Sequence, residues 1–161
     1  MIEFKDVNLV YPNGTQGLKN INVTIKDGEF VVIVGLSGAG KSTFIRSINR
    51  LVTPTSGSLL VDNEDILTFK GKDLRKLRTK TGMIFQNYNL VKRSSVLKNV
   101  LAGRLGHVGT VRSILNMYSK EDLSLAYESL KRVNIEEKIY NRADELSGGQ
   151  RERAFIAVVI A

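Results

Sequence analysis

A glycine-rich segment constrains the fold of this chain more than any other feature of its sequence. It fits the pattern G-x-x-x-x-G-K-[ST] and reads Gly35-Leu36-Ser37-Gly38-Ala39-Gly40-Lys41-Ser42-Thr43. A continuous apolar run, Phe30 to Val34, precedes it, and apolar residues at helical spacing follow it from Ser42 to Leu51. Because such a run is typical of a strand buried on both faces in a parallel sheet, the sequence predicts an α/β fold with a strand, a tight turn and a helix here.

This segment has the chemistry of a phosphate-binding loop. Glycines allow the backbone to wrap around phosphates with successive N–H groups turned toward the anion, and the N-terminus of the following helix adds its positive dipole end. In this pattern Lys41 reaches the β- and γ-phosphates, and the Ser42 hydroxyl ligates Mg²⁺. A chance glycine-rich turn is the alternative. The flanking strand and helix favour the binding of a nucleoside triphosphate, by this chain or by its ancestor.

Composition excludes several other classes of protein. The 161 residues are 42% hydrophobic and 25% charged, with a mean hydropathy of -0.09, as in globular domains. The longest uncharged apolar run, 154–161, is far shorter than the roughly 20 residues that span a bilayer, and Glu3 and Asp6 stand where a signal peptide would be apolar. Without cysteine, and with His107 as the one histidine, the chain is not expected to form disulfides or a zinc site. The cytoplasm is the expected compartment.

The charge of the chain is basic and unevenly distributed. Lys and Arg number 24 against 16 Asp and Glu, a formal net charge of +8, which suits nucleic acid, an anionic membrane surface or a phosphate-bearing ligand. Residues 70–80 alone hold six basic residues and one acid, a local +5. A solvated helix face is the simpler interpretation of this run.

The order of the predicted elements suggests an α/β core with a helical insert. Strands are expected at residues 2–10, 18–25, 58–62 and 82–85, with a turn at Pro12-Asn13-Gly14. From about residue 87 to 145 helical spacing dominates. The clearest helix starts at Ser119, which forms a potential capping box with Asp122. The apolar end, 154–161, is expected to leave an exposed apolar patch and to favour aggregation.

A second glycine motif follows the insert and reads Leu146-Ser147-Gly148-Gly149-Gln150. Taken alone, it could be an ordinary helix N-cap at Ser147. Paired with the first motif, it resembles the signature of ATP-binding-cassette (ABC) ATPases. The resemblance implies that Tyr11 stacks on adenine, although a half-buried tyrosine at a strand end is the alternative. It also implies that Gln86 contacts Mg²⁺ and senses a transmembrane partner, although a plain polar loop is the alternative there.

The resemblance implies a P-loop NTPase core with an N-terminal antiparallel β subdomain and a helical insert. Three parts are expected: residues 1–86 with the nucleotide-binding core, 87–145 as the helical subdomain, and 146–161 with the signature and the start of a helix. The insert is similar to that of phosphonate importer ATPases in the segments Gly103-Arg104-Leu105-Gly106, Arg112-Ser113-Ile114-Leu115, Ser119-Lys120-Glu121-Asp122 and Arg142-Ala143-Asp144.

The sequence departs from the family pattern in three places. Arg151-Glu152-Arg153 stands where Gln-Gln-Arg is common, and Val158 stands where arginine is usual. The Walker B strand, with its metal aspartate and catalytic glutamate, and the switch histidine would lie beyond Ala161. The domain is therefore expected to be incomplete at its C-terminal end, with no catalytic base present and negligible ATP hydrolysis.

The resemblance also implies the partners of the chain. Two copies would enclose two ATP molecules with Mg²⁺, each P-loop facing the other copy's signature, at the cytoplasmic face of the cell membrane. They would drive permease subunits that receive phosphonate from an extracytoplasmic binding protein. Three alternatives stay open: an importer for phosphate, amino acids or metal, a soluble ABC protein that acts on nucleic acid or ribosomes, and a non-functional fragment. Nucleic acid is not an expected partner.

Overall fold

The computed structural model describes residues 1–85, 89–107 and 117–161. The chain forms two compact units, Met1–Arg78 and Thr79–Ala161. The sequence-based boundary after residue 86 falls within the second unit, which also contains residues 146–161. Gln86 lies outside the described residues.

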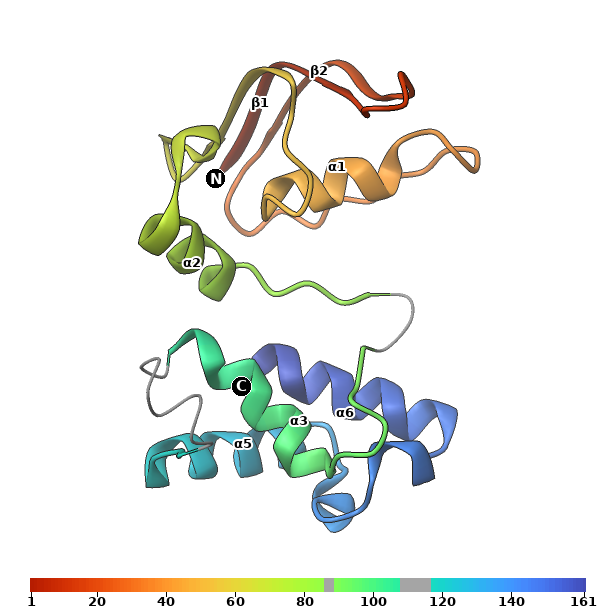
Figure 1. The fold of residues 1–161 in the computed structure, drawn as a ribbon, viewed down its shortest axis with the longest axis vertical. Coiled ribbons are helices and arrows are strands. Elements are labelled where there is room, and N and C mark those ends of the chain that lie inside the picture. Colours follow the sequence, from red (N-terminus) through yellow and green to blue (C-terminus); the bar gives the residue numbers. More distant parts are fainter. Residues whose placement is uncertain (86–88, 108–116) are drawn as a thin grey trace. The chain divides into compact units, whose positions relative to one another are not determined.

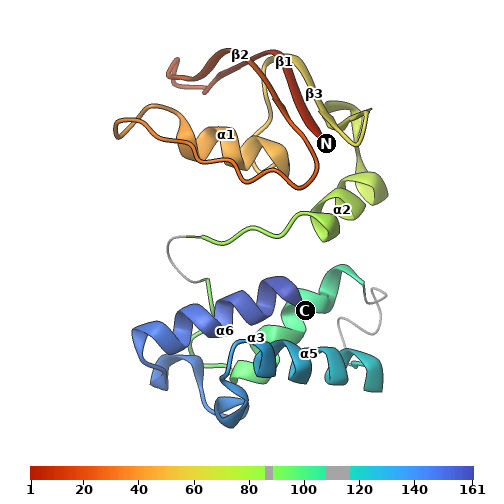
Figure 2. The same ribbon diagram turned by 180° about the vertical axis from the view of Figure 1, so that it is seen from behind.

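The first unit is built on an antiparallel sheet in the order β2-β1-β3-β4. Its strands are β1 (Ile2–Val10), β2 (Gln16–Ile25), β3 (Ser56–Val61) and β4 (Glu64–Asp65). Figure 2 shows β1, β2 and β3 side by side. The N-terminal antiparallel subdomain predicted from the sequence is therefore confirmed, with β1 at the predicted bounds.

One helix, α1 (Lys41–Ile48), covers a face of this sheet (Figure 1). Phe44 of α1 stacks on Phe4 of β1 with ring centroids 4.3 Å apart. The helix ends before the predicted Leu51 because Arg50 adopts a positive φ of 54°, outside the helical region. A short turn, η1 (Ile66–Thr68), follows β4, and α2 (Gly71–Lys80) continues through the end of this unit into the first two residues of the second.

The run from Phe30 to Val34 does not form the predicted buried strand. Phe30 is 93% exposed and Val34 87% exposed. A strand needs neighbouring backbone to satisfy its N–H and C=O groups, and none of the four described strands pairs with this run. The run instead lies beside the apolar side chains of β2 and Phe44, where they enclose a cavity of about 380 Å³.

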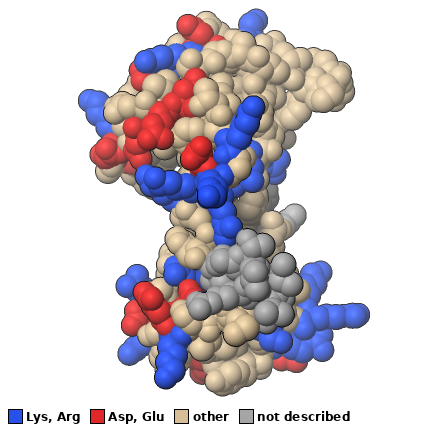
Figure 3. All heavy atoms as spheres, turned by 60° about the vertical axis from the view of Figure 1, so that its left-hand side comes forward, with Lys and Arg blue, Asp and Glu red and all other residues tan. Residues whose placement is uncertain are grey.

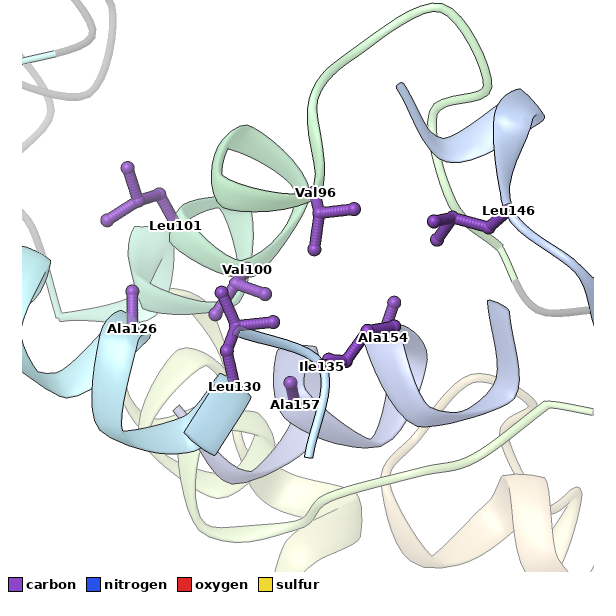
Figure 4. Close-up of a cluster of buried hydrophobic side chains, with 9 residues drawn as sticks. All are labelled: Val96, Val100, Leu101, Ala126, Leu130, Ile135, Leu146, Ala154 and Ala157. Carbon is purple, nitrogen blue, oxygen red and sulfur yellow. The ribbon is translucent and has the colours of Figure 1, made fainter. Parts of the chain in front are cut away.

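The second unit is helical, as the sequence predicted for the insert. It contains α3 (Val96–Gly103), η2 (Arg104–Gly106), α5 (Lys120–Arg132), η3 (Glu136–Lys138), η4 (Ala143–Glu145) and α6 (Gly148–Ile160). Figure 4 shows the core between α3, α5 and α6. Its buried side chains are Val96, Val100, Leu101, Ala126, Leu130, Ile135, Leu146, Ala154 and Ala157.

Two further predictions for this unit are corrected. Residues 82–85 do not form a strand, because none of the described strands pairs with them, and Gly82 lies against Val159 of α6. The apolar end is not an exposed patch, since Ala154, Phe155 and Ala157 are buried and α6 packs on α3 and α5. Within the part of the chain that the structure describes, an exposed apolar run instead lies at residues 30–34.

A polar cluster ties the helices of this unit together. Arg104 Nε donates to Asp122 Oδ1 at 3.0 Å, and Arg104 Nη1 donates to the Ala161 carbonyl at 2.8 Å. Asp122 also accepts from the Ser119 hydroxyl at 2.7 Å, and the predicted capping box at Ser119 is present. The Ser119 hydroxyl and the Arg104 guanidinium together hold the pKa of Asp122 below its usual value. His107 is exposed.

Candidate phosphate-binding loop and signature turn

The glycine-rich loop lines a cavity of about 250 Å³ in the first unit. Three parts of the chain meet there: Tyr11, the start of β2, and the loop with the first turn of α1. The lining residues are Tyr11, Thr15, Gln16, Gly17, Ser37, Gly38, Ala39, Gly40, Lys41, Ser42 and Thr43.

Gly40 sets the direction in which α1 leaves the loop. It is the N-cap of α1 in the left-handed region, with φ 85°. A Cβ at this position would lie 2.4 Å from the Gly17 carbonyl oxygen, so both the backbone angle and the space require glycine. The loop backbone can therefore approach β2 closely, and the first turn of the helix opens into the cavity.

The first turn of α1 is suited to an anion. A helix leaves its first backbone N–H groups without partners inside the helix, and no side chain caps this N-terminus among the described residues. The first turn also contains no acidic residue. The backbone N–H groups of Lys41, Ser42 and Thr43 thus face the cavity, together with the positive end of the helix dipole. Unpaired N–H donors and positive charge favour the binding of a phosphate group.

Lys41 is folded onto the loop. Its Nζ donates to the carbonyl oxygens of Gly35 and Leu36, each at 2.7 Å. An ammonium group has three N–H donors, so these two bonds leave one donor for a ligand. Both bonds also hold the positive charge next to the cavity that the loop encloses.

Tyr11 is joined to the loop by its hydroxyl and by its ring. The hydroxyl lies 3.0 Å from Thr43 Oγ1, and the ring edge packs so closely on Gly17 that a Cβ there would lie 2.8 Å from Tyr11 Cε2. The ring is half-buried in the wall of the cavity. A packing role and a role in base stacking are both compatible with this position.

Three residues of the cavity were not identified from the sequence: Thr15, Gln16 and Gly17. The signal for Gly17 was its place at the start of a predicted strand, where glycine often marks a close approach of two backbones. Thr15 and Gln16 carry no comparable signal, because they belong to the cavity only through the hairpin turn that brings Thr15 O within 2.8 Å of Tyr11 N.

The signature segment begins α6 in the second unit. Ser147 and Gln150 form a capping box, with Gln150 N to Ser147 Oγ at 3.3 Å and Ser147 N to Gln150 Oε1 at 2.9 Å, while Leu146 anchors the turn in the core. Gly148 and Gly149 are exposed, and nothing lies within 4 Å of a Cβ on either. Packing within the chain therefore does not require glycine at these two positions.

Among the described residues no cluster of three or more His, Asp or Glu side chains could hold a metal ion. Ser42 is exposed on the first turn of α1 and lines the cavity, and its hydroxyl oxygen is a possible ligand for a metal ion. One hydroxyl with open space beside a phosphate cavity fits an ion held mainly by phosphate oxygens and water, which is the usual environment of Mg²⁺. The residues present are consistent with a magnesium nucleotide.

Comparison with known proteins decides the family. The sequence profile described as ABC transporter matches residues 18–161. The chain belongs to the ABC transporter family. Its match includes both glycine motifs and the whole second unit.

Curated relatives match almost the entire chain. It is 79% identical over 160 residues to a protein named Phosphonates import ATP-binding protein PhnC 1 from Oceanobacillus iheyensis. It is 72% identical over 160 residues to PhnC 3 from Halalkalibacterium halodurans, and 62% identical over 161 residues to a PhnC from Bacillus cereus. The chain spans 62 to 63% of the length of these relatives.

Solved structures of ABC ATPases share the fold. A dimeric bacterial ABC transporter cassette aligns with a TM-score of 0.85 and 36% identity, over 100% of this chain and 69% of the other. A post-hydrolysis dimer of an ATP-binding cassette, bound to ADP and Pi, aligns at TM-score 0.84 and 35% identity, also over 100% and 69%. Within the described residues, no helix of this chain is long and apolar enough to cross a membrane.

Proposed function

We propose that this chain is the nucleotide-binding part of an ABC importer ATPase that drives phosphonate uptake. The 79% identity to a phosphonates import ATP-binding protein over 160 residues carries this proposal. The cavity at the glycine-rich loop supports the nucleotide-binding part of it, because the cavity combines an uncapped helix N-terminus with a held lysine.

The residues of the cavity have distinct proposed roles. The backbone from Gly35 to Thr43 would surround the β- and γ-phosphates, and Lys41 would exchange its bonds to loop carbonyls for bonds to phosphate oxygens. The Ser42 hydroxyl would hold Mg²⁺, which neutralises charge on the phosphates when bound, with Gln86 as the second proposed contact. Tyr11 would stack on adenine from its place in the cavity wall.

The signature would bind a nucleotide held by a second copy of the chain. The open space beside Gly148 and Gly149 supports this role, because it leaves room for a group from outside the chain. The Ser147 hydroxyl already accepts from Gln150 N and keeps its own proton as a donor. Ser147, Gly148, Gly149 and Gln150 would thus form the other half of a two-copy nucleotide site.

The proposed assembly is a pair of ATPase subunits at the cytoplasmic face of the membrane, bound to permease subunits. Substrate would reach the permease from an extracytoplasmic binding protein. ATP binding would close the pair, and hydrolysis by the whole protein would reopen it. Phosphonate itself would not touch this subunit.

A chimera tests the proposal. Residues 1–161 of this chain replace the matching region of the Oceanobacillus iheyensis relative, and the chimera is expressed in a phosphonate-requiring host that lacks its own importer ATPase but retains the permease and binding protein. Growth on a phosphonate as sole phosphorus source is the expected result. The same chimera with Lys41→Ala should not grow, and it serves as the control for uptake that does not depend on nucleotide.

Failure to grow, with the chimera expressed and able to bind ATP, would contradict the phosphonate assignment. If the chimera instead supported uptake by the permease of a phosphate, amino-acid or metal importer, the chain would be assigned to that kind of importer. Steeply salt-dependent binding of the chimera to nucleic acid, with no support of any permease, would favour a soluble ABC protein.

A further inference from the structure

A strongly basic surface lies on α2, outside the nucleotide cavity. Residues 70–80 carry a net charge of +5 out of the +8 of the whole chain. Figure 3 shows Lys and Arg side chains gathered on the face of the molecule that contains α2. None of the residues proposed for nucleotide binding belongs to this helix.

The helix is fixed with one side inward. Leu77 is 4% exposed in the core of the first unit, and Leu74 packs against the same core. Arg78 joins the end of the helix to the segment that directly follows α1, because its Nε donates to Asn49 O at 3.3 Å and its Nη2 donates to Arg50 O at 2.9 Å. The orientation of α2 relative to the sheet is therefore set by packing and by these bonds.

The opposite side of the helix carries four exposed cations. They share one face because they stand at positions i, i+3, i+4 and i+8 of the helix, and they are Lys72, Arg75, Lys76 and Lys80. Asp73 is the single acid on the helix. The face is about 12 Å long and holds no apolar residue, so it can attract an anionic surface without inserting into it.

The composition of this face favours a membrane over nucleic acid. Proteins that bind single strands stack bases on aromatic side chains, and the exposed face of α2 has no aromatic residue. Proteins that read duplex DNA also use Asn or Gln on adenine, and the exposed face of α2 has neither residue, while three of its four cations are lysines. Lysine is a hydrated point charge, which suits diffuse attraction to a charged lipid surface.

We propose that the outer face of α2, formed by Lys72, Arg75, Lys76 and Lys80, binds the anionic phospholipid headgroups of the membrane. This inference rests on the proposed function only in that it expects the protein to work beside a membrane. The contact adds to any attachment through a permease and holds the subunit against the lipid surface. Each cation near such a surface strengthens binding about fivefold, and salt weakens the attraction.

Vesicle sedimentation tests the proposal with the 161-residue protein. The vesicles contain phosphatidylcholine with 0 or 40% phosphatidylglycerol, at 0.1 M and 0.5 M salt. We expect binding only to the anionic vesicles, with most of it lost at high salt. Lys72→Gln with Lys76→Gln should weaken the binding about 25-fold, while Lys120→Gln with Lys131→Gln on α5, an equal change in net charge at exposed positions, should weaken it far less.

If the two pairs of lysine substitutions weakened vesicle binding equally, the proposal would be overturned, since binding would then depend on net charge alone. Absence of binding to anionic vesicles would also overturn it. So would a double variant of Lys72 and Lys76 that loses binding to duplex DNA but still binds the vesicles as well as the parent protein. ATP binding is measured in parallel. The α2 pair should bind ATP normally, and Lys41→Ala should still bind vesicles, so failure here is distinguishable from failure of the proposed function.

Discussion

Lys41 is the residue on which nucleotide binding should depend most directly. Its replacement by alanine removes a charge-assisted bond to phosphate, so we expect ATP to bind about ten- to a hundredfold more weakly. Titration with a fluorescent ATP analogue measures the change. Lys26→Ala, an exposed lysine of the same unit, should leave the affinity unchanged, and a folded Lys41→Ala protein that binds as well as the parent would refute the site.

Asp122 should govern the acid sensitivity of the second unit. The Ser119 hydroxyl and the Arg104 guanidinium lower the pKa of this carboxyl, so the stabilisation is present above the ordinary aspartate pKa and is lost as the pH falls through the lowered folded value. Asp122→Asn should cost about 1 to 3 kcal/mol near neutral pH. It should also flatten the fall in stability between about pH 5 and pH 2.

Urea denaturation followed by circular dichroism at each pH measures this effect. Glu128→Gln, on the exposed side of the same helix, is the matched control and should leave both the midpoint and its pH dependence almost unchanged. If the stability of Asp122→Asn fell at acid pH as steeply as that of the parent, the result would contradict the role of the cluster.

At the scale of elements, the run from Phe30 to Val34 is the feature most open to self-association. It is apolar and rich in β-branched residues, it belongs to no described strand, and Val32 is 66% exposed. Unpaired segments of this kind associate with one another through their backbones. We expect the 161-residue protein to scatter light increasingly with concentration, and Val32→Lys with Val34→Lys to suppress this.

The control for that experiment places a lysine on the apolar end of the chain. Ile160→Lys, at a position 44% exposed on α6, should reduce scattering little, because α6 buries its apolar side chains against α3 and α5. If Ile160→Lys suppressed association and the double variant did not, the sequence-based expectation about the C-terminal run would be right after all.

At the scale of the whole molecule, binding and hydrolysis of ATP should separate. The family resemblance places the catalytic glutamate and the switch histidine beyond Ala161, and the chain spans 62% of the length of its relative from Oceanobacillus iheyensis. A general base supplied by the remaining segment of that relative would contribute about 10²- to 10⁴-fold in rate. We therefore predict that residues 1–161 bind ATP but release phosphate at least a hundredfold more slowly than the chimera with the relative's remaining segment.

Phosphate release is measured with a coupled assay at equal protein concentration, and each protein carrying Lys41→Ala provides the blank. The same rate for residues 1–161 and for the chimera would refute the prediction. A slow chimera that still supports phosphonate growth would show instead that slow turnover is sufficient for transport.

Local signals in the sequence predicted a large part of this structure. The strand 2–10 and the capping box at Ser119 formed where expected, because their main determinants lie within a few residues along the chain. The helix after the glycine-rich loop also formed, although it ends at Ile48 and not at the predicted Leu51, and the strand predicted before the loop did not form. The roles of Tyr11, Gln86 and the signature remain predictions from the family resemblance.

The sequence by itself predicted the family, the antiparallel subdomain and the helical insert, which were confirmed, and it predicted a phosphate-binding loop, which stays a prediction. Tertiary structure decided what no local pattern contains: that Gly17 makes room for Tyr11 and Gly40, that α6 buries the apolar end, and that Phe30 to Val34 stays unpaired. The same run of apolar residues can form either a buried strand or part of a buried helix. Which of them forms depends on whether backbone or side-chain partners from distant parts of the chain lie beside it.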